Sequence, residues 1–127
     1  MIEISPICII KGETFSPALA EMKTGLRFFK KNEPGELGKL GRFKNAPQPY
    51  GSAELVPLDD SKGYAAMNAL LETLSKGIAI LRECGALDIS FYIAVSYQDQ
   101  ANLEFNTSFL AKIAELKIPL LITVFEK

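Results

Sequence analysis

The stretch MNALLETLSKGIAILRECGALDISFYIAVSY, residues 67–97, decides the fold class. In its first half, apolar side chains recur at the spacing i, i+3, i+4, i+7, which predicts an amphipathic helix over residues 64–84. In its second half, residues 89–97, apolar side chains alternate with small or amphipathic ones, which is typical of a half-buried strand. A long helix that leads directly into such a strand indicates a helix packed on a sheet.

Local signals at both ends of the long helix support this prediction. Gly85 is the expected C-terminal stop, and the acids and serine of residues 59–61 precede the helix, where they would cap it and interact with its dipole. Glu72 and Lys76 are spaced to form an i, i+4 ion pair. Gly77 costs about 1 kcal/mol relative to alanine, and we expect it to let the helix approach the sheet closely.

Shorter elements surround this pair. Apolar runs predict further strands at residues 7–10, 26–30, 103–105 and 118–125. The first of these runs is continuous, which suits a strand covered on both faces, and the last is apolar nearly throughout. Two short helices are expected, one over residues 16–24 between Ser16 and Gly25, and one that begins after Asn106 or Thr107. Their predicted inward side chains are Leu19 and Met22 in the first helix, and Phe109, Leu110, Ile113 and Leu116 in the second.

The region between residues 32 and 57 has a different composition. It holds eight of the sixteen glycines and prolines of the chain, a density that interrupts regular structure. We therefore expect an irregular insertion with at most short strands near residues 40–44 and 52–56.

Together these elements predict a single α+β domain over residues 1–127. The expected architecture is one mixed sheet of four to six strands, with the long helix packed on one face and two short helices, in the order β-α-β, irregular region, α-β-β-α-β. Helices that connect strands require crossovers, which are right-handed.

Composition excludes several classes of function. The chain has 127 residues, 48% of them hydrophobic, and a formal net charge of −1, so it is neither disordered nor basic over its whole surface. It contains no histidine, which excludes every mechanism that needs an imidazole group. Cys8 and Cys84 lie among apolar neighbours, and we expect two buried free thiols, with a disulfide as the alternative.

The expected location is the cytoplasm. The N-terminal residues carry no basic segment, and Pro6 interrupts their apolar run, so they do not form a secretory signal. No apolar stretch approaches the ~18 residues of a membrane helix, so no membrane partner is predicted.

Charge is divided unevenly along the chain. Residues 23–44 carry seven basic and two acidic side chains, whereas residues 51–127 carry six basic and ten acidic ones. Phe28, Phe29 and Phe43 lie among the basic residues, a combination that single-stranded nucleic-acid binders use for stacking and phosphate contact. A solvated loop with its aromatic rings tucked beneath it explains the same pattern.

The segment FKNAPQPYG, residues 43–51, is the most distinctive in the chain. Its two prolines hold the backbone near polyproline geometry, which would present aromatic side chains at a low entropic cost, as protein interfaces favour. The alternative is a stiff loop with Tyr50 packed back on the body. The candidate partner-binding residues are Lys30, Lys31, Lys39, Arg42, Phe43, Lys44 and Tyr50.

Other chemistry has little support. Glycines at positions 35, 38 and 41 meet neither the dinucleotide fingerprint nor the P-loop spacing, so no cofactor is predicted. Without histidine and with two scattered cysteines, no metal site is predicted. Helix capping explains the acids of residues 59–60 better than catalysis does, so no catalytic residue is assigned. A pocket on a sheet face would be the alternative site for an enzyme, lined by Ser90, Tyr92, Ser96 and Tyr97.

The order of elements resembles a bacterial family of small stand-alone domains of unknown function. The resemblance rests on the helix start at residues 15–17, the glycine- and proline-rich middle, the long helix, and the segment IAELKIPL at residues 113–120. It covers most of the chain, carries no catalytic residues, and departs from the family pattern in the absence of tryptophan from the middle region. It implies an α+β domain that works by binding, as in immunity or accessory proteins of toxin systems.

We therefore expect a non-enzymatic cytoplasmic domain that binds another protein through residues 30–57 and the neighbouring sheet edge. A nucleic-acid-binding module that uses residues 23–44 is the first alternative. A small enzyme with a carboxylate and tyrosine pocket is the second.

Overall fold

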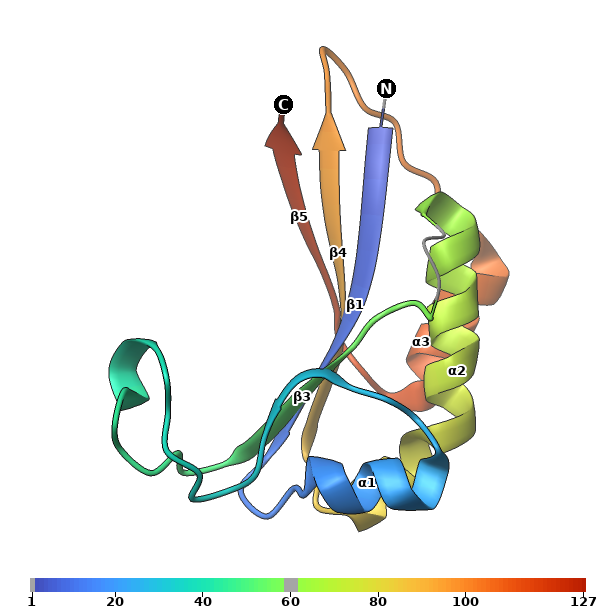
Figure 1. Cartoon of the computed structure of the whole chain (residues 1–127). Helices are drawn as coiled ribbons and strands as arrows, with labels where there is room; N and C mark the ends of the chain where they lie inside the picture. Colours follow the sequence, from blue (N-terminus) through green and yellow to red (C-terminus); the bar gives the residue numbers. More distant parts are fainter. Residues whose placement is uncertain (1, 59–61) are drawn as a thin grey trace. The chain divides into compact units, whose positions relative to one another are not determined.

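The computed structural model describes residues 2–58 and 62–127 and shows one five-stranded sheet (Figure 1). The strands are β1 (Ile2–Gly12), β2 (Phe29–Asn32), β3 (Gly51–Leu55), β4 (Asp88–Tyr97) and β5 (Leu120–Glu126). The other elements are α1 (Pro17–Thr24), the 3-10 turn η1 (Gly41–Phe43), α2 (Gly63–Glu83) and α3 (Thr107–Leu116). The strand order is β2-β3-β1-β4-β5, with β2 antiparallel to β3 and β4 parallel to β5. The predicted α+β class, with a mixed sheet, one long helix and two short ones, is confirmed.

Contacts divide the chain into two compact units. The β5 unit comprises Met1–Cys8, Val56–Lys76 and Ser90–Lys127, and the β2 unit comprises Ile9–Leu55 and Gly77–Ile89.

In the β5 unit, the alternation predicted for β4 is confirmed. Phe91, Ile93 and Val95 are fully buried, and the Phe91 ring meets the Phe109 ring edge to face at 5.6 Å. Figure 1 shows α3 and the first part of α2 on the same face of β4 and β5. At the end of the strand the prediction is wrong, because Ser96 is buried whereas Tyr97 is only half-buried.

The predicted start of α3 is confirmed, since the Asn106 side chain accepts a hydrogen bond from the Phe109 N–H at 2.8 Å. Phe109, Ile113 and Leu116 are buried as expected. Leu110 is not: it is 44% exposed, because the buried stripe of this short helix is too narrow to include it.

In the β2 unit, both predicted ends of α1 are confirmed. The Ser16 hydroxyl accepts a hydrogen bond from the Leu19 N–H, and Gly25 ends the helix at a φ of 77°. The prediction that Leu19 and Met22 point inward is wrong, because they are 36% and 76% exposed. The buried positions are instead Pro17 and Ala20, three residues apart, so a narrower stripe of small side chains faces the core.

The apolar stripe of α2 is confirmed. Its buried members are Met67, Leu70, Leu71, Leu74, Ile78 and Leu81. The predicted ion pair forms, with 3.4 Å between Lys76 Nζ and Glu72 Oε1. Gly77 was expected to let α2 approach the sheet closely, but a Cβ there would lie 3.3 Å from Leu26 Cδ1. This glycine therefore makes room for the segment after α1. The caps predicted at residues 59–61 lie outside the described residues.

Gly85 ends α2 as predicted, with a φ of 100°. A Cβ at this position would lie 2.7 Å from the Thr14 carbonyl group, so the tight approach of two backbone segments also requires glycine here. Cys8 and Cys84 are free and buried, as expected.

Two of the predicted strands are misplaced or missing because side chains bind their backbone. The strand expected at residues 26–30 begins later, at Phe29, as β2. The backbone before it is bound by side chains, because Thr24 Oγ1 accepts a hydrogen bond from the Leu26 N–H and Glu21 Oε2 accepts one from the Phe28 N–H. The expected strand at residues 103–105 is absent. There the Tyr64 hydroxyl accepts a hydrogen bond from the Glu104 N–H at 3.0 Å.

The middle region is more ordered than its composition predicts. The strand expected near residues 52–56 is present as β3, but the one near residues 40–44 is the turn η1. Two single bridges, Leu37 with Pro47 and Gly38 with Lys44, tie the two arms of this loop together.

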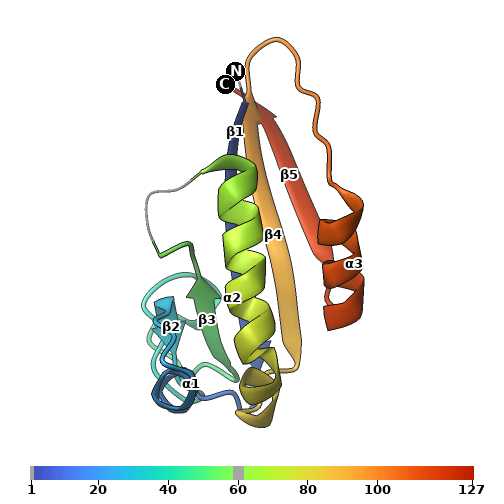
Figure 2. The ribbon, with the colours of Figure 1, turned by 90° about the vertical axis from the view of Figure 1, so that its right-hand side faces the viewer.

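The expectation that the first apolar strand is covered on both faces is wrong. In β1, Cys8 and Ile10 are buried whereas Ile7 and Ile9 are only half-buried, so the strand alternates. In β5 almost every residue is exposed, because β5 is the last strand in the sheet order (Figure 2).

Candidate partner-binding surface

A hollow of about 480 Å³ lies in the β2 unit, where strands β1 to β3 meet the loop that follows β2. Four lysines contribute to its wall, namely Lys11, Lys30, Lys31 and Lys39. Two carboxylates, two amides and apolar side chains complete the lining, among them Glu36, Glu54, Asn32, Gln48, Ile9, Leu37 and Leu40. The hollow thus has an excess of positive charge and an apolar component.

A bulge in β2 explains why two consecutive lysines reach the same hollow. The pairing of β2 with β3 shifts between Phe29 and Lys31, and Lys30 adopts a φ of 42°. In a regular strand, neighbouring side chains point to opposite faces of the sheet. A bulge inserts an extra residue and redirects its side chain, and both Lys30 and Lys31 line the hollow.

The loop from β2 to β3 is held by its own backbone hydrogen bonds. The Gly35 N–H donates to the Gln48 carbonyl at 2.8 Å, and the Gln48 N–H donates to the Glu36 carbonyl at 2.9 Å. Further along, the Gly38 N–H donates to Ala46 at 3.0 Å. These bonds give the wall of the hollow a defined shape.

Next to the hollow, an aromatic pair carries two cations. The Phe43 and Tyr50 rings meet edge to face with their centroids 6.2 Å apart. The Arg42 guanidinium lies 5.5 Å from the centre of the Phe43 ring, and Lys11 Nζ lies 5.3 Å from the centre of the Tyr50 ring. Both rings are half-buried. They are therefore neither fully presented to solvent nor fully packed against the body of the domain.

The seven residues predicted to bind a partner thus form two groups and one outlier. Lys30, Lys31 and Lys39 line the hollow, and Arg42, Phe43 and Tyr50 make the ring cluster beside it. Lys44 is exposed and contributes its backbone to the bridge with Gly38.

Sequence reasoning missed the contributions of β1 and β3. Lys11 and Glu54 both line the hollow from strands in which buried residues alternate with half-buried or exposed ones. The alternation itself was the available signal, because it places both charged side chains on the exposed face of the sheet.

One lysine of the hollow is held by α1. Lys31 Nζ lies 2.5 Å from Glu21 Oε1, and Glu21 Oε2 accepts a hydrogen bond from the Phe28 N–H. These two hydrogen bonds, that from Lys31 above all, lower the pKa of Glu21. Part of the Lys31 charge is therefore balanced, while its position at the wall is fixed.

Large apolar side chains also surround the hollow. Leu37 is 60% exposed and Leu40 is 86% exposed, and both belong to its lining. Phe29, in β2, is 55% exposed, with Lys30 Nζ 5.7 Å from its ring centre. Exposed apolar groups beside cations are typical of surfaces that bind proteins.

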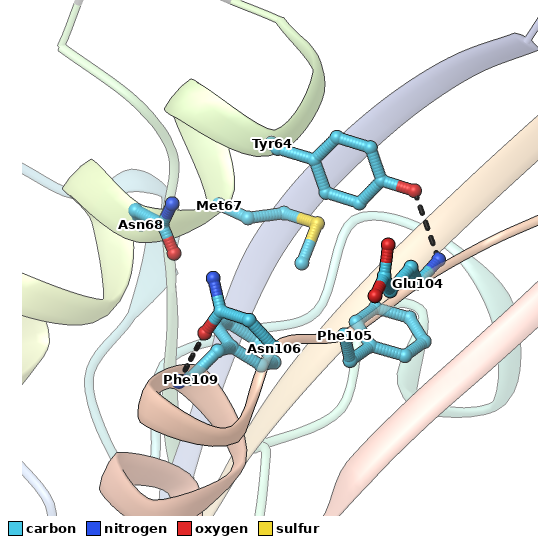
Figure 3. Close-up of a pocket in the computed structure, with 7 residues that line it drawn as sticks. All are labelled: Tyr64, Met67, Asn68, Glu104, Phe105, Asn106 and Phe109. Carbon is cyan, nitrogen blue, oxygen red and sulfur yellow. Dashed lines mark hydrogen bonds between the residues drawn. The ribbon is translucent and has the colours of Figure 1, made fainter.

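A smaller hollow of about 280 Å³ lies in the β5 unit, between the start of α2 and the start of α3 (Figure 3). Its lining comprises Tyr64, Met67, Asn68, Glu104, Phe105, Asn106 and Phe109. The dashed lines in Figure 3 show that the Tyr64 hydroxyl and the Asn106 side chain already accept backbone hydrogen bonds. The Tyr64 hydrogen bond attaches the loop before α3 to α2, and the Asn106 hydrogen bond caps α3, so we regard this hollow as a structural junction.

The residues named for an enzyme site do not meet in either hollow. The Tyr92 hydroxyl is hydrogen-bonded to Thr123 Oγ1 on the face of the sheet. Ser96 is buried, and neither Tyr92 nor Tyr97 lines the hollows described above. Within residues 2–58 and 62–127, no three Cys, Asp or Glu side chains gather where they could hold a metal ion.

No match was found for this chain among protein-family models, curated proteins or solved structures. The resemblance to a family of small bacterial domains therefore stays a prediction. In the part of the chain that the structure describes, no helix combines the length and apolarity needed to cross a membrane.

Proposed function

We propose that this chain is a non-enzymatic binding domain, and that the hollow of the β2 unit takes an acidic segment of another protein. The observation that carries the proposal is the bulge at Lys30, which directs two consecutive lysines to a hollow that also contains exposed leucines. An acidic segment with an apolar side chain would complement both components.

Two features favour a protein over a nucleic acid as the partner. Phe28, one of the aromatic residues expected to stack on bases, is buried against Phe15. The large exposed leucines suit a polypeptide better than a phosphodiester chain.

The test uses a fluorescent peptide of alternating glutamate and leucine as the probe, and a single-stranded oligonucleotide as the comparison. We expect the peptide to bind the wild-type chain, and the double variant Lys30→Glu with Lys39→Glu to weaken that binding by about tenfold or more. A matched control, Lys76→Glu with Lys112→Glu, makes the same change in net charge in the β5 unit and should retain the affinity.

Two outcomes contradict the proposal. Equal peptide binding by both double variants would show that the hollow does not hold the peptide. Binding of the oligonucleotide alone, with an affinity that falls steeply with salt, would identify the nucleic-acid alternative instead.

A cytoplasmic immunity or accessory protein of a toxin system, as the resemblance implies, is the specific form of this proposal. The genes next to this one test it directly. A neighbouring toxin whose acidic surface binds the wild-type chain, but not the Lys30→Glu and Lys39→Glu double variant, would support this role.

A further inference from the structure

The outer edge of β5 has unpaired backbone groups in a known register. The Phe91 N–H donates to the Pro119 carbonyl at 3.0 Å, and the Lys127 N–H donates to the Tyr97 carbonyl at 2.8 Å. Odd-numbered residues of β5 therefore bond to β4. Because successive residues of a strand direct their N–H and C=O groups to opposite sides, Leu120, Ile122, Val124 and Glu126 direct theirs to the outer edge. No strand of the described part of the chain pairs with that edge.

The side chains along this edge are apolar and exposed. Leu121, Ile122, Val124 and Phe125 are between 41% and 51% exposed. Residues 120–125 contain no charge, proline or glycine, which are the features that commonly prevent an edge strand from pairing with another chain.

The strand is also complementary to itself. If two copies of β5 run antiparallel about a two-fold axis at Thr123, Ile122 lies opposite Val124 of the other copy, and Leu120 lies opposite Glu126. All four of these residues direct their backbone groups to the outer edge, so each can exchange hydrogen bonds with its counterpart. On the other face of the strand, Leu121 lies opposite Phe125, so apolar side chains meet apolar ones.

Charge favours the antiparallel arrangement over the parallel one. The acid of the strand, Glu126, lies at its C-terminal end, where the adjacent Lys127 is already ion-paired with Glu3 at 3.0 Å, and the exposed Lys117 precedes its N-terminal end. An antiparallel pair brings the acidic end of one copy toward the basic end of the other. A parallel pair would instead place Glu126 beside Glu126.

We propose that β5 pairs antiparallel with β5 of a second copy of this chain, about a two-fold axis at Thr123. The two sheets then become one continuous ten-stranded sheet. The four exposed apolar side chains of β5 form a contact much smaller than the roughly 800 Å² per partner of a standard interface. The dimer is therefore one that dissociates on dilution.

The first test is the sedimentation of the full chain over a wide range of concentration. We expect a monomer–dimer equilibrium for the wild type and a monomer for Val124→Lys, because a lysine on the edge opposes pairing. Leu87→Lys, at a side chain that is 79% exposed in the β2 unit, is the matched control and should dimerise like the wild type. Circular dichroism establishes that each variant is folded.

The second test measures the register by disulfide formation. Thr123 would face its own counterpart as a pair that is not hydrogen-bonded, with about 4.5 Å between the Cα atoms, a distance that a disulfide can span. We expect Thr123→Cys to form a covalent dimer under mild oxidation much faster than Leu87→Cys, since Cys8 and Cys84 are buried and contribute little background.

A wild-type chain that is monomeric at every concentration would overturn the proposal. So would a dimer that persists in Val124→Lys, or equal rates of cross-linking for the two cysteine variants. Binding of an extended peptide to β5 by a chain that stays monomeric would assign the edge to a different partner, and would also overturn it.

Discussion

The two edges of the sheet, β2 and β5, differ in nearly every property that controls strand pairing. β2 has four residues, a bulge and two consecutive lysines. β5 has seven residues, pairs with β4 in an unbroken register, and exposes a continuous apolar run. One edge thus carries the features that prevent pairing, and the other lacks them.

If both proposals hold, the two edges of this sheet serve two kinds of binding. On β2, the bulge removes the strand as a template and turns its lysines toward a hollow, so recognition there would depend on side chains. On β5, the regular backbone remains available, so recognition there would depend on main-chain hydrogen bonds.

The largest expected effect on stability comes from the core of the β5 unit. Phe91→Ala removes a fully buried ring that meets Phe109, and should lower the free energy of unfolding by about 3–5 kcal/mol. Chemical denaturation measures the change. Phe29→Ala, at a 55% exposed ring of β2, is the control, and a similar loss there would mean that β2 is not the exposed edge described above.

The next effect concerns the attachment of β2 to β3. The Asn32 side chain donates to the Tyr50 carbonyl at 2.9 Å and accepts a hydrogen bond from the Ser52 hydroxyl. Asn32→Ala should destabilise the chain by about 1–3 kcal/mol, since it leaves a part-buried carbonyl without its donor. Hydrogen exchange of the β3 amides should increase while that of β4 stays unchanged. Equal increases in both strands would argue against this local role.

Ser16→Ala should have a smaller effect, about 1 kcal/mol. The Ser16 hydroxyl caps α1 and donates to Glu33 Oε1 at 2.5 Å, so its removal loosens the start of the helix. Thermal unfolding gives the magnitude, and Ser16→Asn is the control because asparagine is also a good helix cap and its amide can still donate to Glu33. If Ser16→Asn falls as far as the alanine variant, capping is not the cause.

The smallest effect is the contribution of the Glu21–Lys31 pair to the pH dependence of stability. Because the pKa of Glu21 is lowered from 4.5 in the folded chain, the ionised Glu21 stabilises the fold above its unfolded pKa. That contribution is lost as the pH falls through the lowered, folded pKa. A titration of stability below pH 4.5 should therefore lose part of its slope in Lys31→Gln. An unchanged slope in Lys31→Gln would show that this pair does not contribute to the pH dependence of stability.

Elements governed by neighbouring residues could be predicted from the sequence. The caps Ser16 and Asn106 and the stop at Gly85 depend on a few adjacent positions, and all three are confirmed. The start of β2 could not be predicted, because it depends on the Glu21 and Thr24 side chains binding the backbone of the segment before it.

For the candidate surface, the sequence named the charges but not their arrangement. Lys30, Lys31 and Lys39 were expected to contribute, and they do line one hollow. The bulge that brings the first two together follows from the pairing of two strands, and Lys11 joins from a third. The exposure of β5 was not expected either, because an apolar run does not specify its place in the strand order.

If the hollow binds as proposed, the left-handed backbone of Lys30 also implies a trade-off between stability and binding. A residue other than glycine at a φ of 42° costs on the order of 1 kcal/mol, a strain that glycine would avoid. Lys30→Gly should therefore give a chain that is as stable as the wild type or more so, yet binds the acidic peptide more weakly. The lysine would then mark a position where the fold gives up part of its own stability to hold a positive charge in place.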